Sequence, residues 1–166
     1  MPRLSLYFPV TPHIVNRGWG VRDPLYQAFG FVRHNGVDLA LREGQPIYAP
    51  FDCRVTEIGV EPMGSGLYIC LLSRGKHGFD DGHATRVEIT FMHLSKAWVR
   101  VGTTLSVGDL VAFGGSTGTT TGSHTHLAPK RVHMTLLGGY RDHDHNDANN
   151  TFDPEPYWNG LYAKRR

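Results

Sequence analysis

The stretch CRVTEIGVEPMGSGLYICLL, residues 53–72, decides the fold class of this chain. Apolar and polar residues alternate over 53–60, which is the pattern of a β-strand with one buried face. Residues 61–66 contain a proline and two glycines and predict a turn, after which the apolar run 67–72 predicts the partner strand. The chain therefore holds at least one β-hairpin, and the sequence around it extends the pattern.

Strand-like segments recur along most of the chain, whereas the three- and four-residue spacing of an amphipathic helix is almost absent. The further strands are predicted at 36–41, 46–49, 86–92, 101–105, 109–114 and 127–137, with loops at 74–83, 106–108, 114–123 and 138–150. The 20 glycines and 10 prolines fit many short segments joined by turns. The pattern predicts an all-β fold, either a two-sheet β-sandwich or a partly closed barrel.

Length and charge restrict the classes of protein. A chain of 166 residues fits a single domain, residues 1–166. The net charge of +2 offers no case for nucleic-acid binding. We expect no membrane insertion, because no apolar run is long enough to span a bilayer. The N-terminal residues do not resemble a secretory signal, so we expect a protein made without one.

The two cysteines, Cys53 and Cys70, are too few for a disulfide scaffold. Both lie in apolar, strand-like segments, which favours buried free thiols over a cross-strand disulfide.

Two short histidine motifs carry the chemistry. The first is His34-Asn35-Gly36-Val37-Asp38, the second is His124-Thr125-His126, and His93 lies between them in the sequence. Gly36 lets the backbone turn tightly, so the side chains of His34 and Asp38 can converge on one ion. In a strand, residues two apart share a face, so both histidines of the second motif can reach the same place.

Two imidazoles and one carboxylate suit zinc, and three protein ligands leave a fourth position for water, as in catalytic zinc sites. The histidines beyond the ligands could then accept a proton and hold an oxyanion. Each motif alone is weak, but their joint occurrence predicts a zinc hydrolase.

Other histidines are poorer candidates. His143 and His145 lie in a polar loop that we interpret as solvated, although its spacing resembles a metal-binding run. His77, His83 and His133 have no ligand-like spacing, and His13 follows a proline in an irregular N-terminal segment.

At these motifs the chain resembles the lysostaphin/LytM-type zinc metallopeptidases, which cut peptide bonds in bacterial peptidoglycan. The resemblance covers about residues 10–130, including the glycine-rich segment 17–22 and the first metal motif, 34–40. Later matches occur at 46–50, 91–95, 107–111 and 115–126. The resemblance implies a β-sandwich with a long active-site groove, a catalytic core of about 10–137 and a C-terminal extension of 138–166.

The resemblance also implies roles. One zinc ion would be held by His34, Asp38 and His126, while His93 and His124 would form the non-ligand catalytic pair. In the family, the motif that corresponds to His124-Thr125-His126 often has a bulky middle residue, and Phe-Glu often follows its second histidine. Here Thr125 takes the middle place and residues 127–130 read Leu-Ala-Pro-Lys.

Members of the family often carry a tyrosine before the first ligand that helps to bind the scissile carbonyl. The candidates for that place here are Phe29, which lacks a hydroxyl, and Tyr26. These differences concern contacts with the substrate and not the metal site.

The leading hypothesis is a monomeric peptidoglycan endopeptidase that acts at the cell wall, outside the cytoplasm or in the periplasm. It would be a phage lysin that leaves with a holin, a virion-borne lytic enzyme, or the mature part of a secreted bacterial hydrolase.

Two other readings belong to different classes. A non-catalytic activator or wall-binding module of the same family would have lost ligands, whereas all five histidine and aspartate positions are present here. A lipoyl- or biotinyl-type carrier is suggested by the hairpin 101–114, but that segment contains no lysine to carry the cofactor.

Overall fold

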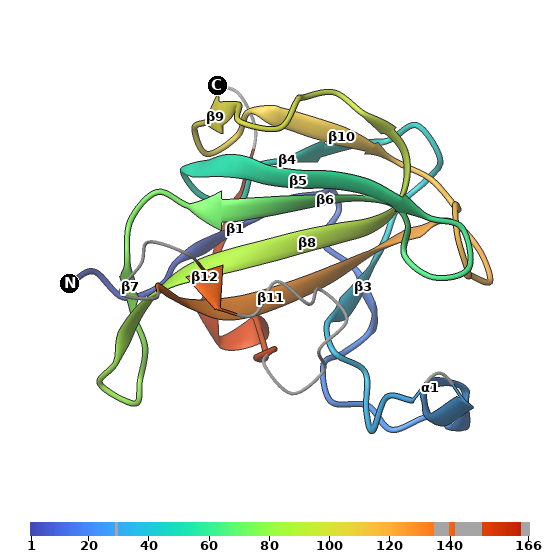
Figure 1. The fold of residues 1–166 in the computed structure, drawn as a ribbon, viewed down its shortest axis with the longest axis horizontal. Coiled ribbons are helices and arrows are strands. Elements are labelled where there is room, and N and C mark those ends of the chain that lie inside the picture. Colours follow the sequence, from blue (N-terminus) through green and yellow to red (C-terminus); the bar gives the residue numbers. More distant parts are fainter. Residues whose placement is uncertain (29, 135–139, 142–150, 164–166) are drawn as a thin grey trace.

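The structure is a computed structural model that describes residues 1–28, 30–134, 140–141 and 151–163, and it is nearly all β (Figure 1). The strands are β1 Leu6–Phe8, β2 Val15–Arg17, β3 Val37–Ala40, β4 Pro46–Tyr48, β5 Cys53–Glu61, β6 Gly66–Ser73, β7 His77–Gly78, β8 Ala84–Ala97, β9 Thr104–Leu105, β10 Leu110–Gly114, β11 His124–Met134, β12 Tyr140–Arg141 and β13 Trp158–Tyr162. One short helix, α1 Pro24–Ala28, and one 3-10 turn, Glu155–Tyr157, complete the described elements.

One large sheet runs in the order β2-β3-β11-β8-β6-β5-β9. It curls because β8 is fourteen residues long: β8 pairs with β6 and β11 over most of its length, and its last residues pair with β10. β10 in turn pairs with β4 in an antiparallel arrangement (Figure 1). A second sheet is formed by β1 and β13, which lie parallel. The predicted all-β class, a sandwich or partly closed barrel, is confirmed.

Alternation along the strands separates two faces of the sheet. Inward side chains, among them Ile69, Ile89, Phe91 and Leu127, are fully buried in the main core. Their neighbours point to the opposite face, where a smaller buried cluster is formed by Tyr68, Cys70, Met92 and Ala128. This second face carries the functional side chains described below.

Several boundaries differ from the sequence prediction. The strand predicted at 86–92 is the middle of β8, and the one predicted at 127–137 already begins at His124. Of the segment 101–105 only the last two residues form β9, because Gly102 adopts a φ of 89° and its N–H donates to the Val55 carbonyl.

Some elements carried no recognisable pattern in the sequence. β1 and β2 have only three residues each, β13 is exposed along most of its length and so does not alternate, and α1 has only five residues. The loop predicted at 74–83 contains β7. The loop 138–150 falls outside the described residues, apart from β12.

Both cysteines are free and buried, as predicted. Cys53 lies in the main core and Cys70 in the smaller cluster, so the two thiols are on opposite faces of the sheet. Burial raises the pKa of each thiol to about 12. Within the described residues no helix is long and apolar enough to cross a membrane.

Leu127 offers a test of the core, because it is fully buried at the centre of the sheet between β3 and β8. Replacing it by Ala should lower the free energy of unfolding by about 2–5 kcal/mol, since a cavity is left among well-packed neighbours. Urea denaturation measures the change. The same truncation at Leu161, which is 56% exposed, should cost less than about 1 kcal/mol. Equal losses would contradict the described core.

Candidate metal centre

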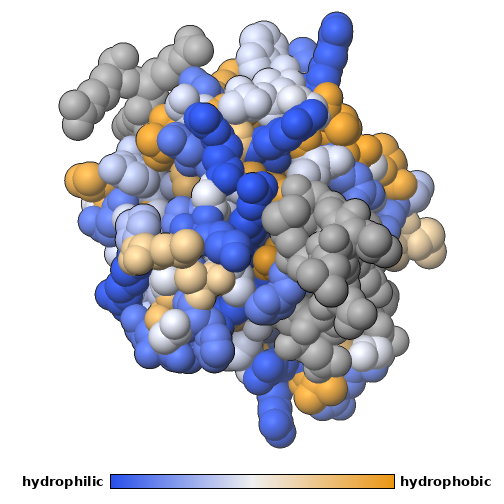
Figure 2. Space-filling view, turned by 60° about the vertical axis from the view of Figure 1, so that its left-hand side comes forward, coloured by the Kyte–Doolittle hydropathy of each residue, from blue (hydrophilic) through white to orange (hydrophobic). Residues whose placement is uncertain are grey.

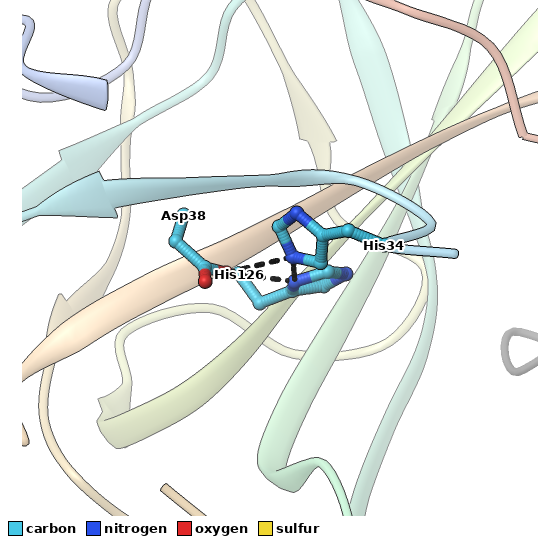
Figure 3. Close-up of side chains that lie close together, drawn as sticks. All are labelled: His34, Asp38 and His126. Carbon is cyan, nitrogen blue, oxygen red and sulfur yellow. Dashed lines mark hydrogen bonds and ion pairs between the residues drawn. The ribbon is translucent and has the colours of Figure 1, made fainter. Parts of the chain in front are cut away.

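Three side chains from two separate parts of the chain converge at one end of the sheet (Figure 3). His34 precedes β3, Asp38 lies on β3, and His126 lies on β11 directly opposite Asp38 in the strand register. His34 Nε2 is 3.0 Å from His126 Nδ1 and 3.1 Å from Asp38 Oδ1, and His126 Nδ1 is 2.9 Å from the same carboxylate oxygen. All three residues are buried.

This arrangement fits a metal ion. Zinc ligands stand about 2.0–2.2 Å from the ion, so donor atoms about 3 Å apart can share one. His34 Nδ1–H donates a hydrogen bond to the Gly18 carbonyl oxygen at 2.8 Å. The lone pair of Nε2 is therefore available to bind a metal ion. Burial alone would raise the pKa of Asp38, but its hydrogen bonds with His126 and His34 outweigh burial and hold the pKa well below its ordinary value. The carboxylate is therefore ionised.

The group lies beside a pocket of about 610 Å³. Asp38 and His126 line this pocket, while the ring of His34 is completely covered. Within the part of the chain that the structure describes, no other group of three histidine, cysteine or acidic side chains has this geometry.

His93 reaches the same pocket through an irregularity in β8. Leu67 of β6 pairs with Leu94, but Ile69 pairs with Phe91, so β8 has one extra residue at this point. His93 has a φ of 62°, an uncommon conformation for a residue with a side chain. The β-bulge places both Met92 and His93 along the pocket, although strict alternation would send His93 into the core.

Two hydrogen bonds hold His93 in this conformation. Its backbone N–H donates to the Ser65 carbonyl at 2.8 Å, and its ring Nδ1–H donates to the Thr117 carbonyl at 2.9 Å. Nε2 is then left as a proton acceptor. Burial lowers the pKa of His93 to about 4, with a further contribution from the neighbouring His124, so the ring is neutral near pH 7.

His124 begins β11 on the same face as His126, as the two-residue spacing predicts. Its Nδ1 is 2.9 Å from the Gly122 carbonyl, and its Nε2 is 3.7 Å from Asp38 Oδ1. The centroids of the His93 and His124 rings are 4.8 Å apart. Four of the five predicted site residues therefore line one pocket, and the fifth, His34, is covered but contacts Asp38 and His126.

Tyr26, on α1, also lines the pocket. Its ring stacks on His34 with centroids 4.9 Å apart, and Arg17 Nη1 donates to its hydroxyl oxygen at 2.8 Å. Because that oxygen accepts from Arg17, its own hydrogen is available to a group in the pocket. Of the two candidates for a tyrosine-like contact, Tyr26 lines the pocket, whereas Phe29 is outside the described residues.

Sequence reasoning missed three contributors to the pocket. One is Arg17, in the glycine-rich segment 17–22; nothing in the sequence pattern indicated its contact with Tyr26. The other contributors are Glu61, the last residue of β5, and Met63, in the turn that follows; the sequence indicated only a turn at both positions.

Gly36 is needed for a reason other than the tight turning predicted from the sequence. A Cβ atom at this position would lie 2.3 Å from the Leu127 carbonyl oxygen and 2.7 Å from His126 Nε2. The backbone of β11 and the imidazole of His126 therefore leave no room for a side chain at position 36.

The remaining histidines take no part in this group. The ring of His13 stacks on that of Phe8, with ring centroids 3.7 Å apart. The ring centroids of His77 and Phe51 are 6.0 Å apart. His83 and His133 are exposed. His143 and His145 lie outside the described residues.

A curled β-sheet that holds two histidines and an aspartate beside an open pocket with two further imidazoles is typical of metal-dependent hydrolases. The chain belongs to peptidase family M23, whose sequence model matches residues 32–135.

Curated relatives agree with this family. An uncharacterized metalloprotease of Haemophilus influenzae is 34% identical over 93 residues, which cover 56% of this chain and 18% of the relative. The glycyl-glycine endopeptidase ALE-1 of Staphylococcus capitis is 34% identical over 94 residues, 57% of this chain and 24% of the relative. The chain thus matches less than a quarter of the length of either protein.

Solved structures show the same fold. The catalytic domain of lysostaphin from Staphylococcus simulans superposes with a TM-score of 0.64 at 25% identity, over 87% of this chain and 91% of that domain. A zinc-containing peptidase from Vibrio cholerae gives a TM-score of 0.62 at 26% identity, over 77% of this chain and 37% of that one.

The crowding at Gly36 predicts that Gly36→Ala displaces His126 and abolishes metal binding. The measurement is the zinc content of the purified chain after dialysis against trace zinc. Gly75→Ala is the matched control, because a Cβ there meets no atom within 4 Å, and this variant should retain its metal. Full zinc retention by Gly36→Ala would contradict the described packing.

Proposed function

We propose that this chain is a zinc-dependent endopeptidase that hydrolyses peptide bonds in the stem peptides or cross-bridges of bacterial peptidoglycan. One zinc ion per chain would be held by His34, Asp38 and His126. The observation that carries the proposal is the convergence of these three donor atoms, within 3.1 Å of one another, on a pocket that His93 and His124 also line.

When bound, zinc supplies a Lewis acid that polarises a carbonyl group and makes water more acidic. Side chains of the protein would transfer the protons and stabilise the oxyanion. His93 and His124 each direct Nδ1 to a loop carbonyl, so each presents Nε2 to the pocket. The neutral imidazole of His93 can accept the proton of an attacking water in this orientation.

The reaction breaks the C–N bond of a peptide, adding hydroxide to the carbonyl carbon and hydrogen to the amine. The imidazole that takes this proton can then donate it to the leaving amine. Tyr26 faces the same pocket, and its hydroxyl hydrogen can be donated to the carbonyl oxygen as negative charge develops there.

Relatives support peptidoglycan as the substrate class. ALE-1 is described as a glycyl-glycine endopeptidase, and ShyA of Vibrio cholerae, 34% identical over 93 residues, as a peptidoglycan DD-endopeptidase. The chain would act as a monomeric, single catalytic domain with its core at about 10–137 and an extension at 138–166. It would work at the cell wall, and phage delivery as a lysin or within a virion is one route to that polymer.

Substitution of the histidines tests the proposal directly. His126→Ala should abolish both zinc binding and the release of peptides from purified sacculi, because a ligand is lost. His93→Ala should keep the zinc and lower turnover by about 10²–10⁴-fold, since only a proton acceptor is lost. His83→Ala, at an exposed site away from the pocket, is the control and should match the parent.

Two outcomes would refute the mechanism: hydrolysis by metal-free protein, or unchanged turnover in His93→Ala. Mass spectrometry of the fragments released from defined peptidoglycans identifies the bond that is cut.

Tyr26→Phe tests the donor to the oxyanion. Removing the hydroxyl should lower kcat by about 10²–10³-fold with a smaller effect on KM, because the contact strengthens as charge develops. Steady-state hydrolysis of a soluble cross-link peptide measures both constants. Tyr7→Phe, on β1 away from the pocket, is the matched control. A change confined to KM would instead assign Tyr26 to ground-state binding.

A further inference from the structure

A second pocket, of about 660 Å³, lies at the end of the sheet opposite the metal centre. It forms where β5 and β8 begin and β6 ends, which is the left-hand end of the sheet in Figure 1, whereas β3 and α1 lie at the right. Figure 2 turns this left-hand side forward, and hydrophilic side chains cover much of the surface there. Three of the residues that line the pocket are arginines: Arg54, Arg74 and Arg86.

Strand alternation explains why two of these arginines point outward. Arg54 stands between Cys53 and Val55, both of which are buried in the main core. Arg86 likewise precedes the core residue Val87. Arg74 directly follows the end of β6, which brings a third guanidinium to the same place.

The arginine pocket lies on the sheet face that also carries the catalytic side chains. Along β8 the outward residues run from Arg86 to Met92, which lines the first pocket. Six residues of a strand span roughly 20 Å, so the two pockets are separate sites.

The charge of this pocket is unbalanced. Within the described residues, none of the three guanidinium groups takes part in an ion pair or a side-chain hydrogen bond, and no acidic side chain lines the pocket. Arg54 and Arg74 are exposed and Arg86 is half-buried. Like charges gathered in one concavity repel one another and raise the local concentration of anions.

We propose that Arg54, Arg74 and Arg86 form a binding site for phosphate groups, either free or carried along an anionic polymer. Guanidinium groups bind phosphate with paired, charge-assisted hydrogen bonds, and the several oxygens of one phosphate can engage donors that arrive from three directions. The hydroxyl of Thr104, which is opposite Arg54 on β9, adds a neutral donor to the lining. No aromatic side chain lines the pocket among the described residues, so bases have no surface on which to stack, which disfavours nucleic acid.

Calorimetric titration of the intact chain at low ionic strength tests this site without reference to hydrolysis. The probes are inorganic phosphate and a poly(glycerol phosphate) of defined length. The parent chain should bind at least one of them saturably: binding of inorganic phosphate indicates a site for the free ion, and binding of the polymer alone indicates a polymer site. The double variant Arg54→Gln/Arg74→Gln should weaken that binding by about tenfold or more.

The matched control is Arg22→Gln/Arg42→Gln, which removes the same charge from exposed arginines that line neither pocket and should bind within about twofold of the parent. Thermal unfolding verifies that both variants fold, and single variants replace the double one if it does not. Four results would overturn the proposal: no binding of either probe, equal losses in the two double variants, equal affinity for poly-glutamate, or tighter binding of a single-stranded oligonucleotide of equal charge.

Discussion

The register between β3 and β11 is the constraint on which the rest of the site depends. Asp38 and His126 are directly opposed in this ladder, and a slip by one residue would turn one of them to the other face of the sheet. The register is held from both sides, because β11 also pairs with β8 over seven residues and buries Leu127 between the two neighbours. The placement of Asp38 opposite His126 is therefore a property of the sheet, whereas His34 stands in the connection just before β3.

Strand periodicity was enough to predict part of this arrangement. The spacing of His124 and His126 puts both on one face of a strand, and the structure confirms it. The hairpin of β5 and β6 and most of the other long strands were also evident from alternation. What these features share is that each depends on residues adjacent in sequence.

The rest of the site depends on contacts that alternation does not encode. His93 reaches the pocket only because β8 has an extra residue there, and strict periodicity would have placed it in the core. Tyr26 is aligned by Arg17 and by stacking on His34, which are contacts of a short helix with the end of β2 and with the connection before β3. Gly36 was noticed for its backbone freedom, but the structure shows that it matters for the space left to His126. The arginine pocket joins three strand ends that lie far apart in the sequence.

One connection, the segment between β10 and β11, supports two of the imidazoles that line the pocket, those of His93 and His124. The ring of His93 is anchored to the carbonyl of Thr117 and that of His124 to the carbonyl of Gly122. Thr117 also accepts from the Leu67 N–H and donates to the Leu94 carbonyl. Lengthening this segment to reshape specificity would disturb both rings at once. The tip of the β5–β6 hairpin, where Met63 is 88% exposed, is the better place for an engineer to graft new recognition.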